Sequence, residues 1–159
     1  VGGIERPLGG TGTDEHVRVI TGLQQKLGVT AADLLCGTHT PGDPPTAERM
    51  FLNGEENTPL RHNCSGKHSG MLAQAILFGE PTADYINPQH PVQRRILRAF
   101  SEMTGVPEAG IALGTDGCSA PVFAVPLCAA AYAFARFCSY IISSAFWRRS
   151  SIFMKAPIG

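Results

Sequence analysis

The sequence predicts an α+β domain in which helices pack on a small, incomplete sheet. Apolar residues recur at helical spacing in several segments, and a glycine stands close to the end of most of them. Two short apolar runs, at residues 111–113 and 122–125, flank the polar turn GTDGCSAP at residues 114–121 and are typical of strands. At 159 residues the chain is long enough for one domain with a buried core.

The first helix is predicted over residues 14–27, where apolar residues lie three or four positions apart. Thr13 can cap its start and Gly28 can end it. A short helix is expected to open at residues 30–33 and to end before Gly37. Residues 37–59 contain four prolines, so we expect a loop there with one turn of helix over residues 47–52.

Three more helices are expected further along the chain. The segment 66–78 is almost entirely apolar after its first turn, which predicts a central, buried helix. Another helix follows Pro91 and runs to residue 103, where Gly105 can close it. A helix of small residues is predicted over residues 126–137.

Composition limits the classes of function. The chain has 13 basic and 13 acidic side chains, so its net charge of zero argues against a partner such as nucleic acid or an acidic membrane surface. No hydrophobic run is long enough to span a bilayer. The odd number of irregularly spaced cysteines indicates reduced thiols in a cytoplasmic protein, not a disulfide framework. The cysteines are Cys36, Cys64, Cys118, Cys128 and Cys138.

Both ends of the chain are unusual. The sequence starts at Val1 with a segment that has no periodic pattern, and no acidic residue follows Asp116. Residues 138–159 break the preceding helical period and contain Ile, Phe and Trp without a clear face. We therefore expect a domain over residues 1–137, truncated at both ends, followed by a divergent tail over residues 138–159.

Candidate chemistry is concentrated in two segments. RHNCSGKHSG, at residues 61–70, leads into a predicted helix, and GTDGCSAP, at residues 114–121, forms the predicted turn. Their side chains able to bind, ligate or attack are His62, Cys64, Lys67, His68, Asp116 and Cys118. Asp116 could bind a substrate ammonium or only cap the turn that follows it. The other three cysteines lie among Leu and Ala and are expected to be small buried hydrophobic residues.

Two interpretations of Cys64 remain open on these residues alone. A helix start and Lys67 would both favour the thiolate of Cys64, which could then attack a carbonyl. The spacing Cys64-x-x-Lys67 copies that of catalytic Ser-x-x-Lys pairs. Alternatively, Cys64 and Cys118 supply two thiolates to a zinc ion, with His62 or His68 as the conventional third ligand.

The motifs HNCSGKHSGMLA and GTDGCSAPVFAVPL, together with INPQHPVQ at residues 86–93, resemble the L-asparaginase II family, the thermolabile, inducible rhizobial type. The similarity runs from about residue 12 to residue 137. It implies a partial serine-β-lactamase-like domain and hydrolysis of L-asparagine to L-aspartate and ammonia. It also implies a small-molecule substrate and a possible homodimer.

The resemblance further implies that zinc is held by Cys64, Lys67 and Cys118, with Asp116 and His68 near the substrate. A lysine amine can ligate only after it loses its proton. The catalytic serines of the family are not retained. The sequence contains no Ser-x-x-Lys, which in the family would precede Val1, and Gly9 stands where a second serine is expected.

Three functions follow, in order of preference. The first is an asparaginase-type amidohydrolase whose activity in this chain is impaired or lost. The second is a non-catalytic zinc-binding or interaction module with the same ligands. The third is an amide hydrolase that uses Cys64 and Lys67 directly.

Overall fold

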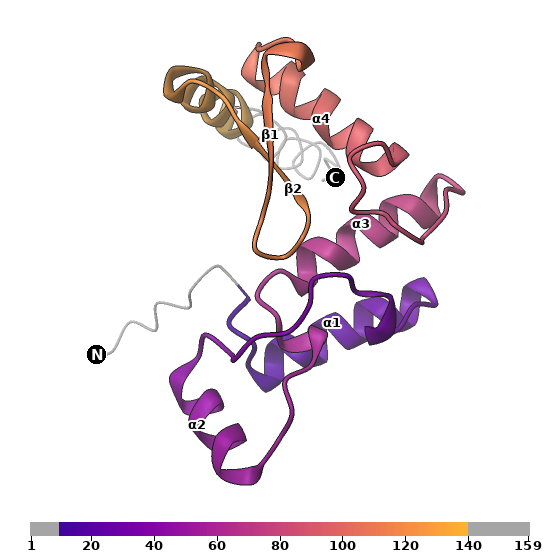
Figure 1. The fold of residues 1–159 in the computed structure, drawn as a ribbon, viewed down its shortest axis with the longest axis vertical. Helices are drawn as coiled ribbons and strands as arrows, with labels where there is room; N and C mark the ends of the chain where they lie inside the picture. The colour runs from indigo at the N-terminus through magenta and orange to yellow at the C-terminus, as the bar shows by residue number, and fades with distance from the viewer. Residues whose placement is uncertain (1–9, 140–159) are drawn as a thin grey trace, which may run out of the picture. The chain divides into compact units, whose positions relative to one another are not determined.

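The structure, a computed structural model, describes residues 10–139 (Figure 1). Its elements are α1 (Asp14–Leu27), α2 (Pro44–Asn53), α3 (Ser65–Leu77), α4 (Pro91–Thr104), β1 (Ala112–Thr115), β2 (Pro121–Ala124) and a helix over residues 127–139. Short 3-10 turns lie at Ala31–Asp33, Pro59–Arg61 and Glu108–Gly110. Within these residues, β1 and β2 form a two-stranded sheet, which confirms the α+β class. Gly9 and the predicted tail from residue 140 on lie outside the described residues.

The chain divides into two compact units. Among the described residues, the first unit comprises 10–94 and 115–122, and the second comprises 95–114 and 123–139. Helix α4 and both strands continue from one unit into the other. The two candidate segments of the sequence belong to the first unit, apart from Gly114 at the start of GTDGCSAP.

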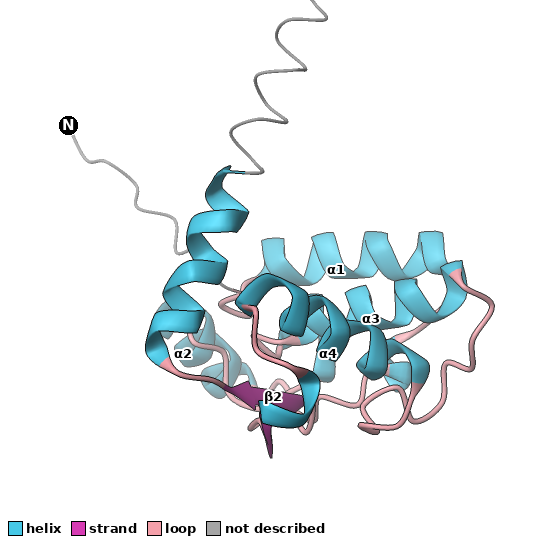
Figure 2. Ribbon diagram, turned by 90° about the horizontal axis from the view of Figure 1, so that it is seen from above, coloured by secondary structure: helices cyan, strands magenta, loops and turns pink. Residues whose placement is uncertain are grey.

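Helix α1 has the predicted limits because its end signals are local. The hydroxyl of Thr13 accepts a hydrogen bond from His16 N at 3.2 Å, and Gly28 ends the helix in the left-handed conformation. The helix buries Ile20 and Gln24. It packs against α3, and Figures 1 and 2 show the two helices side by side.

Helix α2 is longer than the single turn predicted for its segment. Asp43 caps its start by accepting hydrogen bonds from Thr46 N at 3.0 Å and Thr46 Oγ1 at 2.6 Å. Pro44 and Pro45 occupy the first turn, where a helix does not use the backbone N–H that proline lacks. The loop prediction was wrong here because these prolines begin a helix instead of breaking one.

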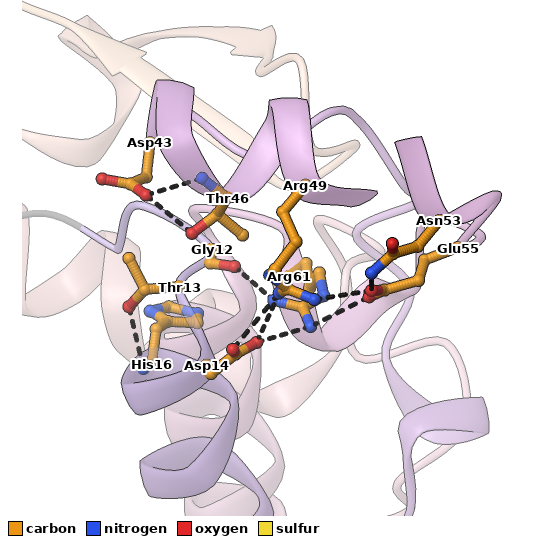
Figure 3. Close-up of polar contacts among 10 residues, drawn as sticks. All are labelled: Gly12, Thr13, Asp14, His16, Asp43, Thr46, Arg49, Asn53, Glu55 and Arg61. Atoms are coloured by element: carbon orange, nitrogen blue, oxygen red, sulfur yellow. Dashed lines mark hydrogen bonds and ion pairs between the residues drawn. The ribbon is translucent and has the colours of Figure 1, made fainter. Parts of the chain in front are cut away.

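Arg61 joins the segment before α3 to the start of α1 (Figure 3). Its guanidinium donates to Gly12 O at 2.8 Å and to Asp14 Oδ1 at 2.7 Å, and its side chain is only 13 % exposed. Arg49 of α2 binds the same Asp14 carboxylate at 3.0 Å. Gly12 has a φ of +78°, and a Cβ there would lie 2.5 Å from the backbone oxygen of Arg61. Only glycine fits this close approach.

The core of the first unit includes much of α3. That helix buries Ser65, His68, Ser69, Met71, Leu72 and Ala75. Its last turn is exposed, with Leu77 at 76 %, so the prediction of a buried helix holds only for the part before this turn. Cys36 is buried as expected, whereas Cys128 and Cys138 are exposed. In the part of the chain that the structure describes, every helix is too short or too polar to cross a membrane.

Candidate metal and substrate site

Two local structures position the candidate side chains. Cys64 is the residue before the first turn of α3, and Lys67 follows it by three positions on that helix. Asp116 and Cys118 lie in the turn between β1 and β2. Asp116 N donates to Ala120 O at 2.9 Å, and Ser119 N donates to Asp116 O at 2.9 Å, so backbone hydrogen bonds hold this turn closed.

The structure brings three potential ligands together. The sulfur atoms of Cys64 and Cys118 and a carboxylate oxygen of Asp116 lie within 4.8 Å of one another. Lys67 Nζ donates to Asp116 Oδ2 at 2.8 Å, which places the amine beside the same group. All four residues come from the two segments singled out in the sequence.

Neighbouring groups shift the pKa values of Asp116, Lys67 and Cys64 in this cluster. Hydrogen bonds from Lys67 and from Gly117 N lower the pKa of Asp116 to about 2, so its carboxylate is ionised. Burial acts to lower the pKa of Lys67, but hydrogen bonds to Asp116 and Cys118 raise it overall. Burial and the neighbouring Cys118 raise the pKa of Cys64. These two effects outweigh Lys67, so the expected stabilisation of a Cys64 thiolate was wrong.

The donor set fits a zinc ion. Zinc prefers cysteine sulfur, imidazole nitrogen and carboxylate oxygen, and two of these ligand types converge here. The thiols of Cys64 and Cys118 must lose their protons to ligate, as cysteines do at zinc sites. Lys67 could join them only as a neutral amine, which would break its ion pair with Asp116.

The two histidines occupy other positions. His62 Nδ1 accepts a hydrogen bond from Cys64 N at 3.0 Å, so this side chain orients the backbone before α3. His68 is completely buried, and its Nδ1 lies 2.7 Å from Tyr85 Oη. Neither belongs to the group of converging ligands found among the described residues, where Asp116 stands instead.

Sequence reasoning missed Tyr85. It is completely buried and contacts both Leu35 N and His68. Its segment, ADYINPQ, overlaps the motif INPQHPVQ, but Tyr85 lies just before that motif and no periodicity singles it out. Nothing local in the sequence could have assigned it to the surroundings of this site.

The fold and this cluster define an α+β protein with a thiol, carboxylate and amine site. The family model of L-asparaginase II matches residues 10–152, which is most of the chain and extends past residue 137. The chain therefore belongs to the L-asparaginase II family, and its function is of the asparaginase type, on a small-molecule substrate. A comparison with curated proteins finds no match.

Proposed function

We propose that this chain is an L-asparaginase-type amidohydrolase domain that binds zinc through Cys64, Lys67 and Cys118. The observation that supports this most directly is the convergence of two sulfur atoms and the Asp116 carboxylate within 4.8 Å, with Lys67 Nζ beside them. The substrate in this proposal is L-asparagine, bound next to Asp116 and His68.

Asp116 has the properties required to bind the ammonium group of an amino acid. Its carboxylate is ionised, and its side chain is 43 % exposed. In the structure, the Lys67 ammonium donates a hydrogen bond to this carboxylate. If Lys67 loses its proton to solvent and ligates the metal, Asp116 Oδ2 becomes free for the substrate ammonium. A zinc ion held by Cys64, Lys67 and Cys118 would supply a positive charge able to polarise an amide carbonyl.

We expect this chain on its own to hydrolyse asparagine slowly. Its 159 residues contain no Ser-x-x-Lys pair, and Gly9 occupies the position where a family serine is expected. Loss of a nucleophile or its base from comparable sites costs on the order of 10⁴–10⁶ in rate. For a polypeptide of these 159 residues alone, the proposal is therefore an asparaginase-type site with slow chemistry.

The main alternative is a non-catalytic zinc-binding or interaction module. It requires the same ligands and no serine–lysine pair. The third function, an amide hydrolase with a Cys64 nucleophile, has less support. Burial and the neighbouring Cys118 raise the pKa of Cys64, which disfavours the thiolate that a thiol nucleophile needs.

Zinc content and ammonia release together distinguish these functions. We expect about one zinc ion per purified chain by elemental analysis, lost in Cys64→Ser and in Cys118→Ser. Cys128→Ser is the matched control because Cys128 is exposed in the second unit. Zinc with slow ammonia release from L-asparagine supports the proposal. Zinc with no release at all supports the non-catalytic module, and a chain without zinc contradicts both.

A further inference from the structure

A buried chain of hydrogen bonds runs beside the candidate metal site, through Tyr85. Leu35 N donates to Tyr85 Oη at 2.8 Å, and Tyr85 Oη lies 2.7 Å from His68 Nδ1. The side chains of Tyr85 and His68 are both completely buried, and their rings meet edge to face. Neither the zinc ligands nor the proposed substrate contacts use the phenol.

These contacts determine which nitrogen of the His68 imidazole carries the proton. Burial raises the pKa of Tyr85 to about 12, so the side chain carries its O–H hydrogen. Because Tyr85 Oη already accepts from Leu35 N, its own hydrogen is available to His68 Nδ1. Nδ1 is then the acceptor of a neutral ring, and the partner pattern assigns the ring proton to Nε2.

The Nε2 atom of His68 is buried and has no hydrogen-bond partner among the described residues. His68 N donates to Cys64 O at 3.0 Å, and the sulfur of Cys64 lies within 4.8 Å of the sulfur of Cys118, so His68 lies beside the cluster. His68 lies one helical turn after Cys64, on the same face of α3. Burial lowers the pKa of His68 to about 4, and a backbone group of Cys118 acts in the opposite direction, as a nearby carbonyl acceptor does.

We propose that Tyr85 and His68 are positioning residues for Cys118: Tyr85 holds the imidazole so that Nε2–H donates to the Cys118 backbone carbonyl when Cys118 ligates zinc. An unpaired buried N–H is costly, so completing this hydrogen bond favours the metal-bound position of Cys118. This inference rests on the proposed function for the identity of the metal. Mutation of a residue that hydrogen-bonds to a metal ligand commonly changes metal affinity by 10–100-fold.

Tyr85→Phe tests the inference, because it keeps the aromatic ring and removes only the hydroxyl. We expect it to weaken zinc binding about 10-fold in a chelator competition titration. In ¹⁵N NMR, we expect wild-type His68 to be protonated at Nε2 and the variant to show a mixture of tautomers. Tyr132→Phe is the matched control, since Tyr132 is 56 % exposed in the second unit, and it should bind zinc like the wild type.

A double substitution separates positioning from packing. His68→Gln keeps an N–H donor near the position of Nε2 but has no tautomers, so adding Tyr85→Phe should weaken zinc binding less than it does in the wild type. On the wild-type chain, added zinc should shift the Nε2–H resonance and slow its exchange with water. This measurement stands even if Tyr85→Phe does not fold.

Three results would overturn the inference. The first is a folded Tyr85→Phe chain that binds zinc as tightly as the wild type. The second is a wild-type His68 that is protonated at Nδ1. The third is an Nε2–H resonance that does not change when zinc is added. Each of them leaves the proposed zinc site intact if the wild-type chain still binds about one zinc ion. A wild-type chain that binds no zinc would contradict the proposed function and this inference together.

Discussion

The environment of His16 shows how burial decides the protonation of a single side chain. Its Nε2 lies 2.7 Å from the hydroxyl of Ser65, the completely buried first residue of α3. A Cβ at Gly10 would collide with the imidazole, so the surrounding backbone leaves no spare room. Burial lowers the pKa of His16 below 6.5, although backbone groups of Leu60 and His62 oppose this effect.

This depressed pKa makes the stability of the chain depend on pH. In the unfolded chain His16 takes up a proton near pH 6.5, whereas the folded chain takes it up only at lower pH. The unfolded state therefore binds more protons below pH 6.5, and the free energy of unfolding falls as the pH is lowered. His16 contributes at most about 1.4 kcal/mol per pH unit to this loss.

Denaturant unfolding between pH 7.5 and 5 should show a shallower decline in His16→Gln than in the wild type. Gln25→Ala is the control, because Gln25 is exposed on the same helix and carries no titrating group, so this variant should keep the wild-type slope. Identical slopes in His16→Gln and the wild type would show that burial does not hold His16 neutral.

The sequence pointed to the side chains that converge at the candidate site, but not to the buried residue that contacts His68. Cys64, Lys67 and Cys118 lie in motifs whose similarity to a family pointed to a common ion, and the structure brings their segments together. Asp116 was assigned to a substrate ammonium or to a cap of the following turn, yet its carboxylate also stands among the potential ligands. Tyr85 was missed because its partners are 50 and 17 residues away, and no local pattern encodes such contacts.

At the scale of elements, local end signals decided which helices could be predicted. Helix α1 combines a Thr cap, acidic residues in its first turn and a closing glycine, and its limits were confirmed. Helix α2 has equally local signals, with Asp43 before its first turn and Gly54 after its last. They were obscured by Pro44 and Pro45, which act as breakers in most positions but not in a first turn.

Because α2 depends on its cap, Asp43→Ala should destabilise the chain. The substitution removes the acceptor for Thr46 N and Thr46 Oγ1, and lost caps of this kind typically cost about 1 kcal/mol. Glu48→Ala is the control on the exposed face of the same helix and should change stability by less than about 0.5 kcal/mol. Thermal unfolding followed by circular dichroism measures both; equal effects of the two substitutions would show that Asp43 does not act as a cap.

For the molecule as a whole, the candidate metal site joins segments far apart along the chain. Cys64 and Lys67 belong to α3, and Asp116 and Cys118 belong to the β1–β2 turn. All four lie in the first unit, whereas the helix over residues 127–139 belongs to the second. A metal bound by these residues stabilises directly only the unit that contains them.

Zinc should therefore protect the two units unequally from hydrogen exchange. A ligand present at 100 times its dissociation constant stabilises the state that binds it by about 2.7 kcal/mol. On zinc addition, we expect slower exchange for amides in α3 and in residues 115–122, and little change in residues 127–139. Mass-spectrometric exchange with and without zinc measures this, and Cys118→Ser should remove the protection because it removes a ligand. Equal protection of both units would mean that zinc acts on the chain elsewhere than at this cluster, and protection that survives in Cys118→Ser would lead to the same conclusion.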